Sequence, residues 1–265
     1  MVNILKSLNY TTRRNMLAVL TIISMVAVPF IISLIVIRYN EMGFGKMTGS
    51  MYMGMISVEM VILFIIAVLI FSTMLVGSDA GDKTINYEML NGHSRGSIFW
   101  ARIIAGYGWS VLLVMVLYLL PFGYFTLING WGLSVDKAEA LARLILLIFP
   151  IIRLASLFMM LTTLSGSAGR GAAYSYLEMM LVIMAGSVLE EAFDMDTSYI
   201  FSTSDIAWIV TSQKSKNLVI NGRNVTRLDY AVADDKAVKI IIISLVMSAI
   251  YLLIAYKVFK KKDRD

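Results

Sequence analysis

The sequence predicts an all-α, polytopic membrane protein. Of its 265 residues, 58% are hydrophobic and 15% are charged. Soluble domains have about 45–50% apolar and about 25% charged residues. The apolar residues form blocks of about 18 or more, the length that a helix needs to cross a bilayer. The polar residues gather between these blocks, which is the pattern of spans joined by loops.

We expect a single transmembrane domain over residues 1–265, with both termini on one side of the membrane. Lysine and arginine are enriched in cytosolic flanks, and the segments before the first span and after the last are both basic, so that side is predicted to be the cytosol. The six expected spans are residues 16–37, 53–76, 98–125, 140–164, 172–189 and 237–259.

Residues 1–15 predict a short helix ahead of the first span. Its mixture of apolar and basic side chains is typical of a helix lying in the membrane interface, with its cations near anionic headgroups. A frayed tail that only supplies a positive stop is the alternative. The apolar residues are Ile4, Leu5 and Leu8, and the basic ones are Lys6, Arg13 and Arg14.

The loop at 78–97, between the second and third spans, contains its own helix signal. Asp82 can cap a helix by accepting a hydrogen bond from a free backbone N–H group. Residues 83–90 have good helical character, and Gly92 stands where a left-handed terminating residue is wanted. Ser94 can cap the next helix, which runs into the third span.

This short helix is apolar on two sides. Ile85 and Met89 share one side, whereas Tyr87 and Leu90 share nearly the opposite one. Such a helix suits a position between the base of the membrane domain and a partner protein. An ordinary loop helix without a partner fits the spacing equally well.

The longest polar segment, residues 191–236, is expected on the outer face. Asn221-Gly222 between β-branched residues predicts a hairpin with a two-residue turn, because Asn and Gly tolerate the positive φ that such a turn needs. Residues 193–210 are expected to form a short helix folded back against the membrane.

Three ionisable residues fall inside the expected spans: Glu59, Arg153 and Glu178. A charge at such depth costs about 2.5–3.5 kcal/mol, so these side chains should face protein or water. Arg153 is expected to pair with Glu178 or Glu59. The group either lines a transport path or forms a structural ion pair that fixes helix register.

The central loop resembles the loop after the second span in permease subunits of type-2 ABC exporters, with the bacitracin- and lantibiotic-resistance permeases and the peptide-toxin exporters as the nearest group. The order of spans and loops is also similar over the whole chain. The resemblance is carried by Asp82-Lys83-Thr84-Ile85, Tyr87-Glu88-Met89-Leu90, Gly92, Ser94-Arg95, Ile98 and Arg102.

The resemblance implies that residues 82–90 form a coupling helix that docks on a separate ABC ATPase subunit. It also implies a bacterial cell membrane location, pairing with a second copy or a sister permease, and export of amphipathic peptides or hydrophobic drugs. The coupling residues would be Asp82, Lys83, Ile85, Tyr87, Glu88, Met89, Leu90, Gly92 and Arg95.

The chain is not expected to be an enzyme or to bind a cofactor, because it lacks the G-x-x-x-x-G-K-[ST] stretch that wraps nucleotide phosphates. It has no cysteine and one histidine, which leaves little for a metal site. The net charge of +5 fits cytosolic flanks better than nucleic-acid binding. The alternatives are an ion-coupled secondary transporter using Glu59, Arg153 and Glu178, and a membrane sensor or anchor.

Overall fold

The computed structural model describes residues 1–39, 48–54, 58–77, 88–133, 135–193, 197, 200–210, 214–220, 223–229 and 234–261. Helices make up nearly all of the described chain, as the sequence predicted. The elements are α1 (Val2–Arg14), α2 (Met16–Tyr39), α3 (Gly49–Gly54), α4 (Val58–Gly77), α7 (Arg95–Asn129), α8 (Lys137–Ser165), α9 (Ala168–Phe193), α10 (Ser202–Val210), β1 (Lys214–Ile220), β2 (Arg223–Asp229) and α11 (Asp234–Lys261).

Within the described ranges, five helices are long and apolar enough to cross a membrane, namely α4, α7, α8, α9 and α11. This agrees with the predicted class of multi-pass membrane protein. The first expected span, residues 16–37, coincides with the 24-residue helix α2.

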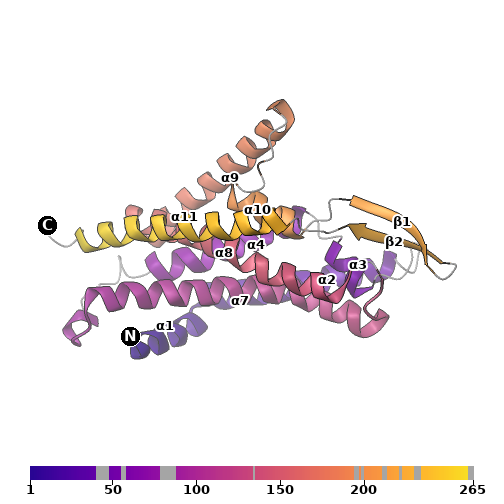
Figure 1. Ribbon diagram of the computed structural model, residues 1–265. Coiled ribbons are helices and arrows are strands. Elements are labelled where there is room, and N and C mark those ends of the chain that lie inside the picture. Colours follow the sequence, from indigo (N-terminus) through magenta and orange to yellow (C-terminus); the bar gives the residue numbers. More distant parts are fainter. Residues whose placement is uncertain are drawn as a thin grey trace.

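The long helices lie roughly along one axis, and the bundle has two distinct ends (Figure 1). Both chain termini lie at one end, together with the start of α7 and the turn between α8 and α9; we call this the terminal end. The opposite end, which we call the hairpin end, carries α3, β1 and β2. Helices α4, α8 and α11 run toward the terminal end, and α7 runs away from it.

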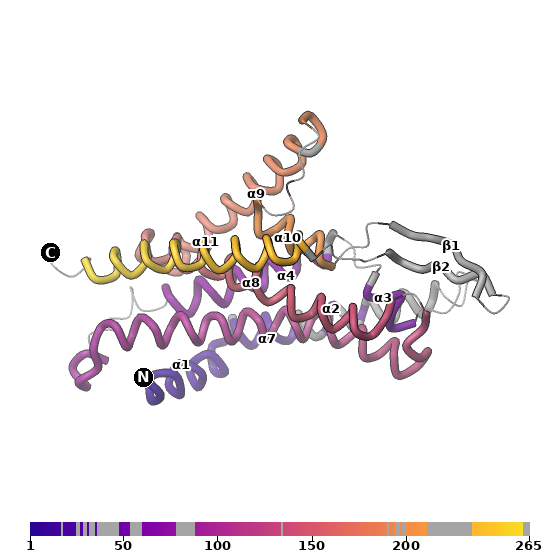
Figure 2. The backbone as a smooth tube through the Cα atoms, in the orientation of Figure 1, coloured from indigo at the N-terminus to yellow at the C-terminus, as the bar shows by residue number. Residues whose placement is uncertain are grey.

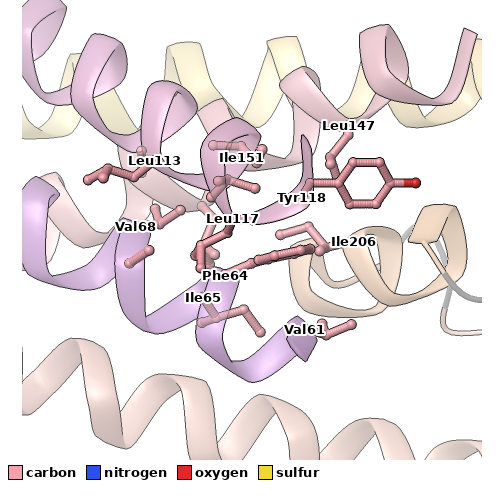
Figure 3. Close-up of a cluster of buried hydrophobic side chains, with 14 of the residues drawn as sticks. Val61, Phe64, Ile65, Val68, Leu113, Leu117, Tyr118, Leu147, Ile151 and Ile206 are labelled. Atoms are coloured by element: carbon pink, nitrogen blue, oxygen red, sulfur yellow. The ribbon is translucent and has the colours of Figure 1, made fainter. Parts of the chain in front are cut away.

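The core lies between α4, α7 and α8, and α10 closes it on one side (Figure 3). Phe64 and Val68 of α4 are fully buried beside Leu117 of α7, Ile151 of α8 and Ile206 of α10. In lipid these contacts owe little to the hydrophobic effect, so close packing and hydrogen bonds must stabilise them. One such hydrogen bond joins Tyr107 Oη of α7 to Ser156 Oγ of α8, with 2.6 Å between the oxygens.

Helix α9 is far less enclosed than α4. Of the most apolar window of α4, 67% is buried, against 17% for α9. The first turn of α9 packs closely on α8, because Gly171 lets the two backbones approach; a Cβ there would lie 2.7 Å from Thr162 Cα. From that turn α9 leans away from the other long helices (Figure 1).

Two described helices cover most of the second expected span, residues 53–76, and residues 55–57 between them lie outside the described residues. Helix α3 is held to α7 by stacking of Tyr52 on Phe125, with the ring centroids 5.4 Å apart. Helix α4 is described from Val58, so Glu59 lies near its hairpin end.

After α9 the chain returns into the bundle as α10, which Figure 2 shows beside the long helices. Helix α10 packs against α8, α4 and α9. Strands β1 and β2 follow as an antiparallel pair in which Ile220 faces Arg223. That register leaves two residues for the turn, the predicted Asn221-Gly222, which lie outside the described residues.

Candidate functional sites

The first candidate site is the turn that leads into α7 at the terminal end. Of the predicted coupling residues, Glu88, Met89, Leu90, Gly92 and Arg95 are described. The others, Asp82, Lys83, Ile85 and Tyr87, lie outside the described residues, so the structure does not test them. Residues 88–90 are helical and lead directly into a turn.

Backbone hydrogen bonds fix the shape of this turn. The His93 N–H group donates to the Glu88 carbonyl at 3.2 Å, and the Gly92 N–H group donates to the Met89 carbonyl at 2.9 Å. This pair of bonds is the Schellman arrangement that ends a helix. Gly92 has a φ of +82°, the left-handed conformation predicted for it. Ser94 then caps α7, as predicted, by accepting from the Ser97 N–H group at 3.3 Å.

An ion pair ties the turn to α7. Arg102 Nη2 lies 2.9 Å from Glu88 Oε2, and the exposed fraction of the side chains is 3% for Arg102 and 21% for Glu88. Because the arginine is two turns inside α7 while the glutamate is near water, the pair joins the buried helix to the surface of the terminal end. A movement of Glu88 therefore acts directly on α7.

Met89 is partly buried against a small apolar cluster. Ile4 of α1 and Ile98 of α7 form the buried part of this cluster, and Phe259 of α11 packs against it as well. Arg95 Nε also donates to Met89 Sδ at 3.3 Å, so the side chain of Arg95 braces the turn. The turn thus packs against a cluster that α1 and α7 share.

Leu90 differs from Glu88 and Met89 because its side chain faces outward, with 81% of its surface exposed. Its neighbours Asn91 and Gly92 are also exposed. Met89 and Leu90 were predicted to lie on nearly opposite sides of the short helix. In its described residues, 88–90, Met89 faces the bundle and Leu90 faces outward. Leu90 is thus an exposed apolar side chain on a turn that backbone hydrogen bonds hold in shape.

The second candidate site lies in the middle of the bundle. Arg153 of α8 lies 3.4 Å from Asp205 of α10, measured from Nη1 to Oδ2, and Asp205 is completely buried. Arg153 Nη2 also donates to the carbonyl of Ile200, just before α10. Arg153 therefore pairs with Asp205, an acid from the segment that was expected outside.

A second arginine holds the other end of α10. Arg143 Nη1 donates to the carbonyl of Ile209 at 2.9 Å, and its Nη2 lies 3.5 Å from Glu139 Oε1. A cation suits the carbonyl groups at the end of a helix, where the dipole is negative. Arg143 and Arg153 are ten residues apart on α8, about 15 Å along the axis, so they hold α10 at both ends.

Glu178 of α9 is near this group but is not held in the same way. The positive charge of Arg153 attracts it. Its Oε2 atom is buried without a hydrogen-bond partner among the described residues. For Glu59, the third residue of the predicted set, the side chain lies outside the described part of the structure.

Sequence reasoning missed Asp205, Arg143 and Ile200 as members of the central group. A signal for Asp205 does exist, because it is followed by the apolar run Ile206-Ala207-Trp208-Ile209-Val210. That run is too short to predict a span and too apolar for an exposed loop. It is the kind of segment that folds back into a bundle, where an acid needs a cation.

Among the residues that the structure describes, no three histidine or acidic side chains gather closely enough to hold a metal ion. Comparisons of the chain with known protein families, characterised proteins and solved structures found no match. Any functional assignment therefore rests on the residues and contacts given above.

Proposed function

We propose that this chain is the membrane-spanning subunit of an ATP-driven exporter in the bacterial cell membrane. A separate ABC ATPase subunit hydrolyses ATP, and a second copy or a sister permease completes the transport path. Helix α2 is the sixth span in this proposal. The cargo is an amphipathic peptide, such as a bacteriocin or toxin, or a hydrophobic drug.

The observation that carries the proposal is the contrast between Met89 and Leu90. Met89 is packed against a buried cluster of α1 and α7, and Glu88 is bound to buried Arg102 of α7. Leu90 projects outward from the same turn. A partner that binds Leu90 can therefore push or pull α1 and α7 together, which is what coupling to an ATPase requires.

The distribution of charge supports a cytosolic terminal end. Helix α1 ends with Arg13 and Arg14, and α11 ends with Lys260 and Lys261. The turn between α8 and α9 is followed at once by Arg170. Basic flanks of this kind favour the cytosolic side of a bacterial membrane. The proposed ATPase contact at Leu90 lies five residues before the start of α7, and α7 begins at this same end (Figure 1).

Co-purification with an ATPase subunit from the same cell tests the proposal. Affinity-tagged chain is expressed in its host and solubilised in mild detergent, and co-purified proteins are identified by mass spectrometry. We expect an ABC ATPase in the wild-type sample and its loss on Leu90→Asp, since a charge placed at the contact opposes docking. Leu133→Asp is the matched control, because Leu133 is an exposed leucine in the connection between α7 and α8 at the hairpin end.

The secondary-transporter alternative keeps one favourable observation, the unpartnered Glu178 oxygen in a candidate span. Transport measurements in proteoliposomes separate the two functions. Flux that follows an ion gradient without nucleotide would replace the exporter proposal with the secondary transporter. Ligand binding without any flux would instead favour the membrane sensor or anchor.

A further inference from the structure

Arg153 has two acidic neighbours in the middle of the bundle, Asp205 and Glu178. Asp205 accepts a hydrogen bond from Arg153, whereas Glu178 Oε2 has no hydrogen-bond partner among the described residues. The next arginine on α8, Arg143, lies about 15 Å along the helix and has Glu139 beside it. Glu178 is therefore the acidic group at mid-span that can take a further partner.

Glu178 is the less buried of these two acidic residues. Asp205 is completely buried and is bound to Arg153, whereas the side chain of Glu178 is only half-buried. Glu178 also belongs to α9, the least enclosed of the five candidate spans. It lies about 15 Å from the first residue of that helix, close to the middle of a bilayer.

The surface around Glu178 is apolar and aromatic. Residues three and four positions away on a helix share a face, which places Tyr174 and Leu181 on either side of Glu178. Both are exposed. A tyrosine ring and a leucine side chain beside a carboxylate form a surface suited to a cation with an apolar body, since the ring face attracts positive charge as well.

We propose that the α9 face formed by Tyr174, Glu178 and Leu181 binds the positively charged group of an amphipathic cargo. A bound ammonium or guanidinium group would donate a hydrogen bond to the unpartnered Oε2 atom and stabilise the ionised carboxylate at this depth. The apolar part of the same molecule lies against Tyr174 and Leu181. The role in export rests on the proposed function, whereas the binding itself does not.

The test is binding of a fluorescent hydrophobic cation, rhodamine 6G, to the purified full-length chain in nanodiscs of uncharged phosphatidylcholine. Fluorescence anisotropy is titrated for the wild type, Glu178→Gln and Glu191→Gln, with empty nanodiscs subtracted. Glu191 is the control because it is an exposed acid near the hairpin end of the same helix. We expect Kd to rise about tenfold or more in Glu178→Gln, as loss of one partner of a desolvated charge pair requires, and to stay unchanged in Glu191→Gln.

The proposal is overturned if Glu178→Gln binds the dye as tightly as the wild type, or if Glu191→Gln weakens binding equally. If Glu178→Gln does not fold, Tyr174→Ala decides the question, because the Tyr174 side chain is exposed and leaves no buried cavity when truncated. Weaker binding by Tyr174→Ala supports the proposal, and unchanged binding refutes it. No ATPase is present in this measurement, so its failure is distinct from a failure of Leu90→Asp to disturb docking.

Discussion

Two buried arginines perform different tasks at the two candidate sites. Arg102 binds Glu88, which is 14 residues away in the chain, and Arg153 binds Asp205, which is 52 residues away. Glu88 keeps contact with solvent, whereas Asp205 has none. A pair that touches water can break and re-form at small cost, but a pair in the middle of the bundle cannot. The first suits a moving joint, and the second fixes the position of α10.

Arg153→Met should give the largest loss of stability. It leaves Asp205 buried and charged without its arginine, and breaking a buried pair in this way costs about 3–5 kcal/mol. The free energy of unfolding in mixed detergent micelles measures the effect. If the variant is expressed normally and transports at the wild-type rate, Arg153 has no part in the transport path.

A double variant shows whether this cost arises from the unpaired acid. Arg153→Met combined with Asp205→Leu removes both charges, and apolar replacement of a buried pair is often nearly neutral. We expect the double variant to recover most of the lost stability. Equal instability of the single and double variants would mean that Arg153 acts chiefly through the Ile200 carbonyl.

The sequence was sufficient to find Arg153 but not its partner. A charge inside a long apolar block is visible without a structure, and so are the cap at Ser94 and the stop at Gly92, because both depend on local backbone chemistry. Asp205 comes from a segment whose depth depends on the packing of α10 between other helices. Tertiary packing of that kind leaves only a short apolar run in the sequence, and such runs do not specify where they are buried.

The Glu88–Arg102 pair was partly predictable from the sequence. Both residues were singled out, Glu88 in the coupling loop and Arg102 near the start of the third span, but the sequence did not pair them. The side chain of Arg102 extends toward the terminal end, where it meets Glu88. Their contact depends on the sharp turn at Gly92, which brings residue 88 back over α7.

Glu88→Gln should reduce stability much less than Arg153→Met, by about 1 kcal/mol, because the glutamate is partly solvated and glutamine can still accept from Arg102. Its effect on function should be larger than its effect on folding. We expect the ATPase to remain bound, since Leu90 is unchanged, while less cargo is moved for each ATP hydrolysed. Reconstituted transport and phosphate release, measured on the same preparation, give this ratio. An unchanged ratio would remove Glu88 from the coupling route.

Lys239→Ala should give the smallest loss of stability among these variants. Lys239 Nζ lies 3.7 Å from Asp235 Oδ2 one turn earlier on α11, and both side chains are mostly exposed. An ion pair of this kind contributes little, so the free energy of unfolding should change by no more than about 0.5 kcal/mol. The same micelle assay measures it beside the two buried pairs. A change as large as that of Glu88→Gln would mean that lipid or a second chain covers the start of α11, since exposure to water is what makes the pair weak. The contrast between buried and solvated pairs would then have to be drawn for the assembled transporter instead of the single chain.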